Sequence, residues 1–262
     1  MTYAAMHIAR TGLDAQDTRM RVISNNLANV NTTGFKRDRA AFETLAYQTI
    51  TAPGAQSTAE TKYATGLNLG TGVKVQGTAR IDTQGSLTQT GNSFDLALDG
   101  DGYFQVQLPG GELGYTRAGN FNRSPEGLLV TSEGYQVMPG ITVPTNATQV
   151  TIGTDGTVTA QVPGQNEGTN IGQIQVASFP NATGLQSTSD NYLKETASSG
   201  AANLGIAGQD GRGNIRQGSL EASNVNVVEE LVDMIETQRA YEVNSKMISA
   251  TDDMLKYVNQ NI

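Results

Sequence analysis

Few residues of this chain have the types and spacing of a catalytic or ligand-binding site. The sequence around those few does not supply the partners that such a site would need. The single histidine, His7, lies between Met6 and Ile8, and a Ser-His-Asp triad would need it as its base. The sequence has no Gly-x-Ser-x-Gly elbow to supply a nucleophile. A structural or surface role for His7 is therefore favoured.

Two glycine-containing patterns suggest ligand binding only at first sight. Asp99-Gly100-Asp101-Gly102 resembles the start of a calcium loop, but neither a third oxygen ligand nor flanking helices follow from the sequence. The glycine-rich stretches 66–72 and 208–213 lack the preceding strand, the following helix and the Gly-Lys-Ser/Thr motif of a phosphate loop. We interpret the first as a hairpin turn and the other two as linkers.

Composition excludes further classes of protein. The 262 residues include 17 basic and 25 acidic side chains, a net charge of −8, with no cysteine and one histidine. Thiol catalysis, disulfide scaffolds and Cys-based or multi-His metal sites are therefore excluded, and the acidic balance argues against nucleic acid as a partner. No apolar run approaches membrane-spanning length, and the N-terminus does not read as a Sec-type signal peptide. We expect no enzyme activity, no cofactor and no membrane insertion.

The positions of glycine and proline divide the chain into three parts. All seven prolines lie between Pro53 and Pro180, and 27 of the 30 glycines lie between Gly54 and Gly213. Both ends are therefore free to be helical. The middle alternates short apolar runs such as Tyr103-Phe104-Gln105-Val106 with turn dipeptides, which indicates an antiparallel β domain.

Each end carries a seven-residue repeat that is typical of helices packed as coiled coils. The N-terminal helix should stop near residues 31–34, where Gly34 could cap it, and the C-terminal helix should begin near Val225 with Ser223 or Asn224 as its cap. From these repeats we predict an assembly interface. It comprises Met6, Leu13, Met20, Ile23, Leu27, Val30, Leu231, Met234, Tyr241, Met247, Ile248, Met254 and Leu255.

Charge favours pairing of the two ends with each other. Residues 1–50 carry six basic and four acidic side chains, net +2, and residues 214–262 carry four basic and eight acidic, net −4. Opposite charges beside the apolar seams favour mixed over like pairing. A self-contained helical hairpin would satisfy the same pattern, but the polar β middle leaves two long helices little else to pack against, which favours assembly between chains.

The expected fold class is α+β. Residues 1–34 and 222–262 would form a coiled-coil-like helical domain, and residues 74–210 a central antiparallel β domain. Residues 35–73 would form an extended connector arm, and residues 211–221 a return connector.

Both ends and a central run of the sequence resemble the rod and hook family of flagellar axial proteins. The stretch Ser24 to Arg37 is similar to the family's N-terminal signature, the stretches from Glu221 to Ile235 and from Gln238 to Lys246 to its C-terminal signature, and the run Leu96 to Val106 to its β domain. The matching motif residues are Asn25, Asn26, Leu27, Ala28, Asn29, Asn31, Gly34, Phe35, Lys36, Ser223, Asn224, Val225, Gln238, Arg239, Ala240, Tyr241, Asn244 and Ser245.

Within this family the connector arm resembles that of distal rod subunits. Hook proteins are longer, and short proximal rod proteins lack most of the β middle. A proximal rod paralogue of similar size is the remaining alternative within the family. The resemblance implies that the arm stiffens the assembly through Tyr47, Pro53, Gly54, Gly66, Gly70 and Gly72.

The resemblance also implies a function and a set of partners. The chain would polymerise into the straight distal rod, a rigid helical tube that transmits motor torque to the hook and encloses the export channel. Its partners would be further copies of itself, proximal rod proteins, the hook protein, the L- and P-ring proteins and the flagellar type III export apparatus. It would lie in the basal body, between periplasm and outer membrane, and be exported without a cleaved signal peptide.

Two alternatives come from other classes of protein. A surface fibre with coiled-coil ends and a β head would usually show one continuous coiled coil rather than complementary segments at both termini. A secreted glycosidase would need paired carboxylates and aromatic sugar platforms, and the absence of tryptophan counts against it.

Overall fold

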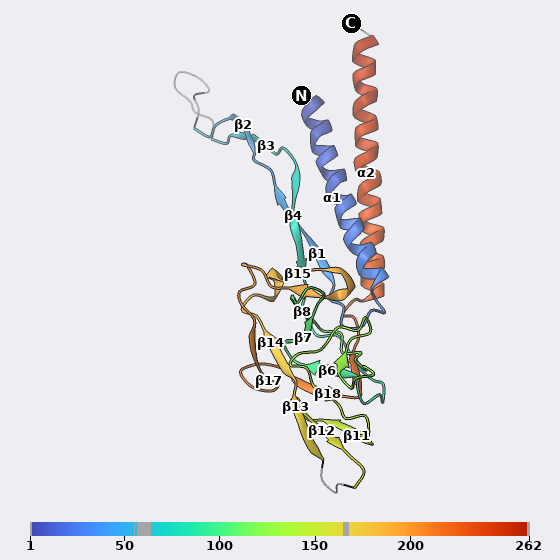
Figure 1. Ribbon diagram of the computed structural model, residues 1–262. Helices are drawn as coiled ribbons and strands as arrows, with labels where there is room; N and C mark the ends of the chain where they lie inside the picture. Colours follow the sequence, from blue (N-terminus) through green and yellow to red (C-terminus); the bar gives the residue numbers. More distant parts are fainter. Residues whose placement is uncertain (1, 55, 57–63, 165–167, 261–262) are drawn as a thin grey trace. The chain divides into compact units, whose positions relative to one another are not determined.

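A computed structural model describes residues 2–54, 56, 64–164 and 168–260 of the chain (Figure 1). Residues 55 and 57–63 of the expected arm lie outside the described residues. So do residues 165–167 of the expected β domain and the last two residues of the C-terminal helical segment.

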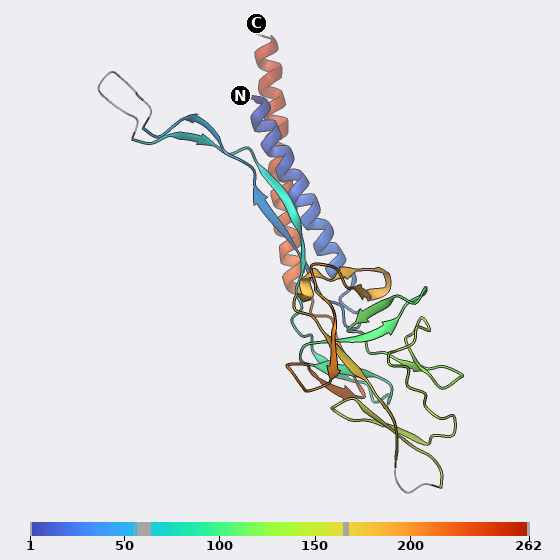
Figure 2. The same ribbon diagram turned by 60° about the vertical axis from the view of Figure 1, so that its left-hand side comes forward.

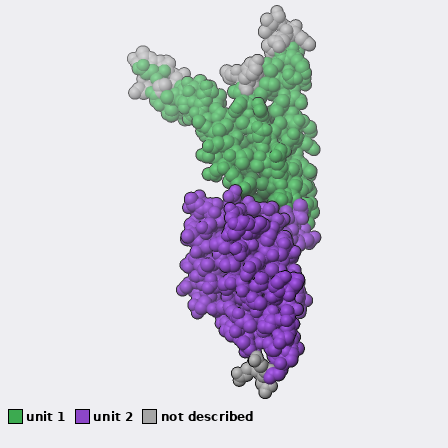
Figure 3. All heavy atoms as spheres, in the orientation of Figure 1, with its two compact units in different colours: residues 1–27, 38–79, 226–262 green, residues 28–37, 80–225 purple. Residues whose placement is uncertain are grey.

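The chain divides into two compact units (Figure 3). Unit 1 comprises residues 1–27, 38–79 and 226–262, and unit 2 comprises residues 28–37 and 80–225. One long helix at each end and mainly antiparallel strands between them confirm the expected α+β class.

Unit 1 contains both helices, α1 (Thr2–Ala28) and α2 (Val227–Gln260), which run side by side (Figures 1 and 2). The cap of α2 is Asn226, whose side-chain Oδ1 accepts a 3.1 Å hydrogen bond from the Val228 amide, rather than Ser223 or Asn224. Glu229 and Glu230 stand in the first turn, where negative charge favours the helix dipole.

The first helix ends earlier than the sequence suggests. It stops at Ala28, and residues 29–34 form turns. Gly34 has a positive φ of 66°, but its N–H donates to the Glu221 carbonyl at 2.8 Å instead of capping the helix. The Gly34 N–H, which would cap the helix, is instead used in a tertiary hydrogen bond to Glu221.

The remainder of unit 1 is a pair of narrow β ribbons. Strand β1 (Asp38–Thr44) pairs with β4 (Val73–Arg80), and β2 (Gln48–Thr51) pairs antiparallel with β3 (Leu67–Leu69). The Leu45 N–H donates to the Gly72 carbonyl at 2.9 Å and links the two ribbons. Part of the range expected to be a connector arm is therefore hydrogen-bonded strand.

Unit 2 is built from a six-stranded sheet and smaller sheets. The large sheet has the order β15-β16-β8-β7-β14-β17, and β11-β12-β13 form a second sheet. Pairs β10-β9, β18-β6 and β19-β5 complete the unit. The two last pairs involve strands from the expected return connector, which is thus part of the β structure.

The strands of unit 2 are short, and their bounds are as follows. They are β5 (Leu87–Gln89), β6 (Leu96–Asp99), β7 (Tyr103–Gln107), β8 (Leu113–Thr116), β9 (Asn122–Arg123), β10 (Leu129–Val130), β11 (Gln149–Ile152), β12 (Thr157–Gln161), β13 (Thr169–Gln173), β14 (Gln175–Ser178), β15 (Gln186–Ser187), β16 (Leu193–Lys194), β17 (Asn203–Ile206), β18 (Asn214–Gln217) and β19 (Ser219–Glu221). Two 3₁₀ turns, Ala182–Gly184 and Ser189–Asn191, interrupt them.

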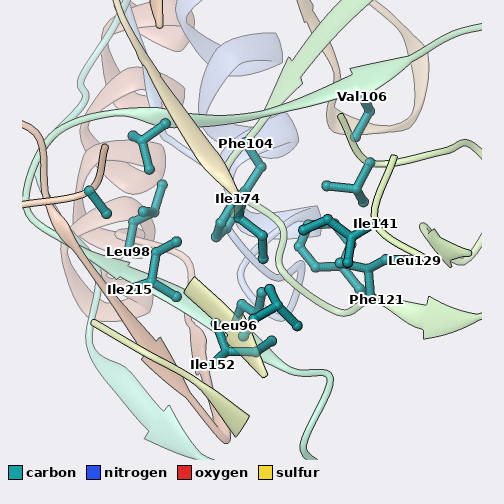
Figure 4. Packing of buried hydrophobic residues seen from close by; sticks show 14 of the residues in the cluster. Leu96, Leu98, Phe104, Val106, Phe121, Leu129, Ile141, Ile152, Ile174 and Ile215 are labelled. Carbon is teal, nitrogen blue, oxygen red and sulfur yellow. The ribbon is translucent and has the colours of Figure 1, made fainter. Parts of the chain in front are cut away.

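The hydrophobic core belongs to unit 2. Leu96, Leu98, Phe104, Ile174 and Ile215 are fully or almost fully buried in one cluster (Figure 4). Phe104 meets Phe121 edge to face at 5.2 Å between ring centroids, a favoured aromatic geometry. In the described part of the chain, neither helix is apolar enough over a sufficient length to cross a membrane.

Candidate assembly surface

Three contacts define how α1 and α2 pair. The Asn26 side-chain amide donates to Oε1 and Oε2 of Glu230 at 3.3 and 3.2 Å, and Arg19 forms a 3.1 Å ion pair with Asp233. A Cβ built at Gly12 would lie 3.0 Å from Nδ2 of Asn244. Residue numbers rise along α1 as they fall along α2, so the helices are antiparallel.

The side of α2 that faces α1 is polar. Glu230, Thr237 and Thr251 are only 4%, 0% and 5% exposed, and with Asn244 they recur at steps of seven, which places all four on one helix face. The hydroxyls of Thr237 and Thr251 donate to backbone carbonyls one turn earlier, at 2.6 and 2.8 Å. These four residues share the seven-residue spacing of the apolar repeats, but because they are polar, an apolar pattern does not reveal them.

The predicted interface residues divide by helix. On α1 and just beyond it, Ile23 is buried, whereas Met6, Leu13, Met20, Leu27 and Val30 are half-buried. On α2, Met234, Ile248 and Leu255 are half-buried, and Leu231, Tyr241, Met247 and Met254 are exposed. The pairing with α1 within one chain therefore leaves much of the predicted α2 stripe uncovered.

Further apolar residues of α2 are exposed and were absent from the predicted interface. They are Val227, Val228, Val232, Ile235, Val243 and Tyr257. Among the described residues, seventeen of the nineteen exposed large hydrophobics lie in unit 1. Apolar surface concentrated in this way marks an interaction site.

The N-terminal family motif is held by specific polar contacts. Asn26 and Asp38 exchange two hydrogen bonds: the side-chain amide donates to the Asp38 carbonyl at 2.9 Å, and the Asp38 N–H donates back to Oδ1 at 3.0 Å. Gly34 is required twice over, because its φ is positive and a Cβ would lie 2.5 Å from the Arg117 carbonyl carbon.

Lys36 and Glu221 form the centre of a buried charge cluster in unit 2. Lys36 Nζ donates to Glu221 Oε1 at 2.5 Å and to the Thr83 carbonyl at 2.8 Å, and Arg117 Nη1 lies 3.2 Å from Glu221 Oε2. Burial lowers the pKa of Lys36, and the hydrogen bond to Glu221 offsets this only in part. The sequence identified Lys36 only as a motif residue, and the fold shows that it is buried beside Glu221 and Arg117.

The C-terminal motif begins with an amide that joins two other segments. Asn224 Oδ1 accepts from the Arg37 N–H at 2.8 Å, and its Nδ2 donates to the carbonyls of Ile81 and Thr83 at 2.8 and 3.0 Å. Ser223 accepts from the Val225 N–H at 3.3 Å. These motif residues therefore organise the backbone of unit 2.

The other motif residues are less enclosed. Asn29, Phe35, Ala240 and Asn244 are half-buried, Val225 is buried, and Asn25, Ala28, Asn31, Gln238, Arg239, Tyr241 and Ser245 are exposed. The seven exposed residues are accessible for contacts outside the chain.

The predicted arm residues lie in unit 1, in the loops and turns beside strands β2, β3 and β4 rather than in the strands themselves. Tyr47 is exposed and packs near Gly70, where a Cβ would lie 3.6 Å from its ring. A Cβ at Gly66 would collide with Pro53 at 2.6 Å, and one at Gly72 would collide with the hydroxyl of Thr11 on α1. Gly54 has a positive φ of 81° with open space around it.

Family models match three parts of the chain. Residues 6–36 match the flagella basal body rod protein, residues 97–160 match the FlgE/F/G D1 domain of the flagellar hook protein, and residues 216–261 match the C-terminal part of the flagellar basal body rod FlgEFG proteins. These ranges contain the two terminal motifs and part of the β domain.

Whole-chain relatives decide the family. The flagellar basal-body rod protein FlgG of Buchnera aphidicola from Acyrthosiphon pisum is 49% identical over 256 residues, covering 98% of both chains. FlgG of Caulobacter vibrioides is 48% identical over 257 residues, again covering 98% of both. The chain belongs to the FlgG family of flagellar rod proteins. Members of the FlgG family are structural proteins of the flagellar basal body.

A second Caulobacter relative, a rod protein of another kind, is less similar to this chain. The rod protein FlgF of the same organism is 36% identical over 250 residues, covering 93% of this chain and 92% of its own. Within one organism, the chain is thus closer to FlgG than to FlgF.

Proposed function

We propose that this chain is a subunit of the distal rod, and that it polymerises into a straight, rigid helical tube. The observation that carries the proposal is the row of exposed apolar side chains along α2, which includes Val228 at 70% and Ile235 at 50% exposure. Covering this apolar surface would be favourable, because removing apolar area from water contributes about 25 cal/mol per Å². A neighbouring copy of the chain is the partner that a rod protein has in greatest supply.

Seven of the ten exposed large apolar residues described on α2 form two groups on different faces. Val228, Leu231, Val232 and Ile235 have the i, i+3, i+4, i+7 spacing of one face. Further along, Val243, Met247 and Met254 share a face that is offset by roughly a quarter turn, at about 100° per residue. Two faces favour contacts with more than one neighbour, which a head-to-tail helical polymer needs.

Charge supports the pairing of α1 from one copy with α2 from another. The seven acidic and three basic residues of α2 give it a net charge of −4, and α1 has three basic and two acidic residues, net +1. Opposite signs favour heterotypic contacts and disfavour pairing of two α2 helices.

The ribbon formed by β2 and β3 supports the proposed stiffening role of the arm. Tyr47, Ile50, Leu67 and Leu69 are all exposed on this narrow ribbon, which has no core of its own to bury them. Packing against an adjacent subunit would cover them and brace the two subunits against bending.

The remaining proposals follow from membership of the FlgG family. The tube would enclose the export channel and pass motor torque to the hook, with proximal rod proteins below it and the L- and P-ring proteins around it. Subunits would reach it through the flagellar type III export apparatus. A proximal rod subunit is the second candidate, and the lower identity to FlgF disfavours it.

Electron microscopy of isolated basal bodies labelled with antibody against this chain tests the proposal. Label on the straight rod near the outer rings is the expected result. Label low on the rod would support the proximal assignment, and label on the curved external segment a hook assignment. Well-formed basal bodies without label would contradict a rod role and favour a separate surface fibre.

A further inference from the structure

The chain passes between the two units four times. The crossings fall between residues 27 and 28, 37 and 38, 79 and 80, and 225 and 226. Any force that enters unit 2 from unit 1 through the covalent chain must therefore pass through the first or last residues of three unit 2 segments, 28–37, 80–86 and 221–225.

Backbone hydrogen bonds tie these three segments together. The Gly34 N–H donates to the Glu221 carbonyl at 2.8 Å, the Ile81 N–H to the Arg37 carbonyl at 2.9 Å, and the Ala222 N–H to the Ser86 carbonyl at 2.8 Å. Each segment is thus bonded to at least one of the others within a few residues of a crossing.

Side chains add a second set of ties at the same place. The Asn224 side chain connects all three segments, since it accepts from the Arg37 N–H and donates to the carbonyls of Ile81 and Thr83. It also donates to the Thr83 hydroxyl at 3.1 Å. One amide therefore uses both its oxygen and its nitrogen to bind neighbouring chain.

Glu221 supplies the charge at the centre. Its side chain is 0% exposed, and its Oε1 accepts from Lys36 Nζ and from the Gly85 N–H at 2.5 and 2.9 Å. Its Oε2 accepts from Arg117, which also donates to the Gly100 carbonyl at 2.8 Å. Hydrogen bonds to charged groups are stronger in such water-excluded surroundings.

We propose that Lys36, Glu221, Asn224 and Arg117 form a junction clamp that holds the four crossings together, so that load entering unit 2 is shared among them. This rests on the proposed rod function, because a subunit that transmits torque is loaded through these crossings. Bonds that share a load must break together, whereas separate crossings would open one after another. A stable β fold does not by itself require charged residues at these positions. In the clamp, these charged residues provide a mechanical connection between the segments.

Single-molecule pulling on the full-length chain tests the clamp. The sequence has no cysteine, so two introduced cysteines provide unique attachment points. Cysteines at the exposed positions Ala28 and Asn226 load the clamp, and cysteines at the exposed positions Asn146 and Gln186 load unit 2 elsewhere. In each pulling geometry, Glu221→Gln is compared with the parent chain and with Glu112→Gln, an exposed carboxylate paired with Lys194.

The expected result is a loss that depends on the pulling geometry. Glu221→Gln should raise the rupture rate at constant force about tenfold or more between residues 28 and 226, which is the scale of a charge-assisted hydrogen bond. The same variant should change the rate between residues 146 and 186 far less, and Glu112→Gln should change neither. Asn224→Ala removes four hydrogen bonds and no charge, and should show the same selectivity.

Two results would overturn the clamp. Equal acceleration in both pulling geometries would show general destabilisation of unit 2, and no acceleration between residues 28 and 226 would show that the cluster carries no load. If Glu221→Gln fails to fold, Asn224→Ala decides between these outcomes. The pulling measurement uses single chains, so its result does not depend on whether antibody labelling of basal bodies confirms the rod assignment.

Discussion

Asn26 on α1 donates its side-chain amide to both carboxylate oxygens of Glu230 on α2, in a seam where both side chains are almost completely buried. The same Asn26 also exchanges two hydrogen bonds with the backbone of Asp38. One family motif residue thus fixes both the register of the helix pair and the start of β1.

Replacing this amide should destabilise the helix pair. Asn26→Ala leaves the buried Glu230 carboxylate without the Asn26 donor and should cost about 1–3 kcal/mol, the scale for unsatisfied buried polar groups. Urea unfolding followed by far-ultraviolet circular dichroism measures the loss of helix. Ser24→Ala, at an exposed position of the same helix, is the control, and an equal midpoint for both variants would contradict the prediction.

An acidic residue on the first exposed face of α2 should block polymerisation. Ile235→Asp places a charge where the proposed contact between copies is apolar, and burying it unpaired would cost several kcal/mol. Sedimentation and electron microscopy of polymers measure assembly, and circular dichroism checks that the helix remains. Leu113→Asp, a similar substitution at a 44% exposed position of unit 2, should assemble normally. Normal polymers from Ile235→Asp would remove this face from the interface.

Gly34→Ala should destabilise the protein more than alanine at another glycine with a similar backbone conformation. Gly34 and Gly91 both have positive φ, 66° and 77°, but a Cβ meets the Arg117 backbone only at Gly34. Alanine at either site incurs backbone strain of about 1 kcal/mol, and Gly34→Ala should add a steric cost of similar size or more. Thermal or urea unfolding compares the pair. Equal losses would mean that the close approach is relieved without cost.

The stability of unit 2 should fall as pH rises from 10 to 12. Burial raises the pKa of Tyr103 from 10.0 to about 12, so in this window the folded state keeps a proton that the unfolded state has lost. Stability from this group is complete below pH 10 and is lost as pH approaches 12, by about 2–3 kcal/mol at most, at 1.36 kcal/mol per pKa unit.

Matched phenylalanine variants isolate this effect. The pH slope of the unfolding free energy should be shallower in Tyr103→Phe than in the parent chain. Tyr47→Phe, at an exposed ring, should leave the slope unchanged. A parent slope retained in full by Tyr103→Phe would show that other groups cause the alkaline loss.

The local sequence pattern predicted the order of the helices and the β region. It did not predict the residues at which the helices begin and end. The seven-residue repeats and the scarcity of glycine predicted both helices, and the turn dipeptides predicted the β middle. The end of α1 at Ala28 and the cap at Asn226 depend on partners far along the chain, such as Glu221 for the Gly34 N–H. Residues 211–221 read as a connector because their composition does not show that β18 and β19 find partners in β6 and β5.

The sequence by itself determined that two helical ends enclose a β region, that no thiol chemistry is possible, and which motifs resemble the rod and hook family. These depend on residue type and spacing, which act locally. Only the tertiary structure decided that α2 turns the polar line of Glu230, Thr237, Asn244 and Thr251 toward α1 and leaves apolar side chains outside. It also decided that Lys36 meets Glu221 across 185 residues of sequence. The energy of a buried charge or an exposed apolar face depends on neighbours, and those are brought together only by folding.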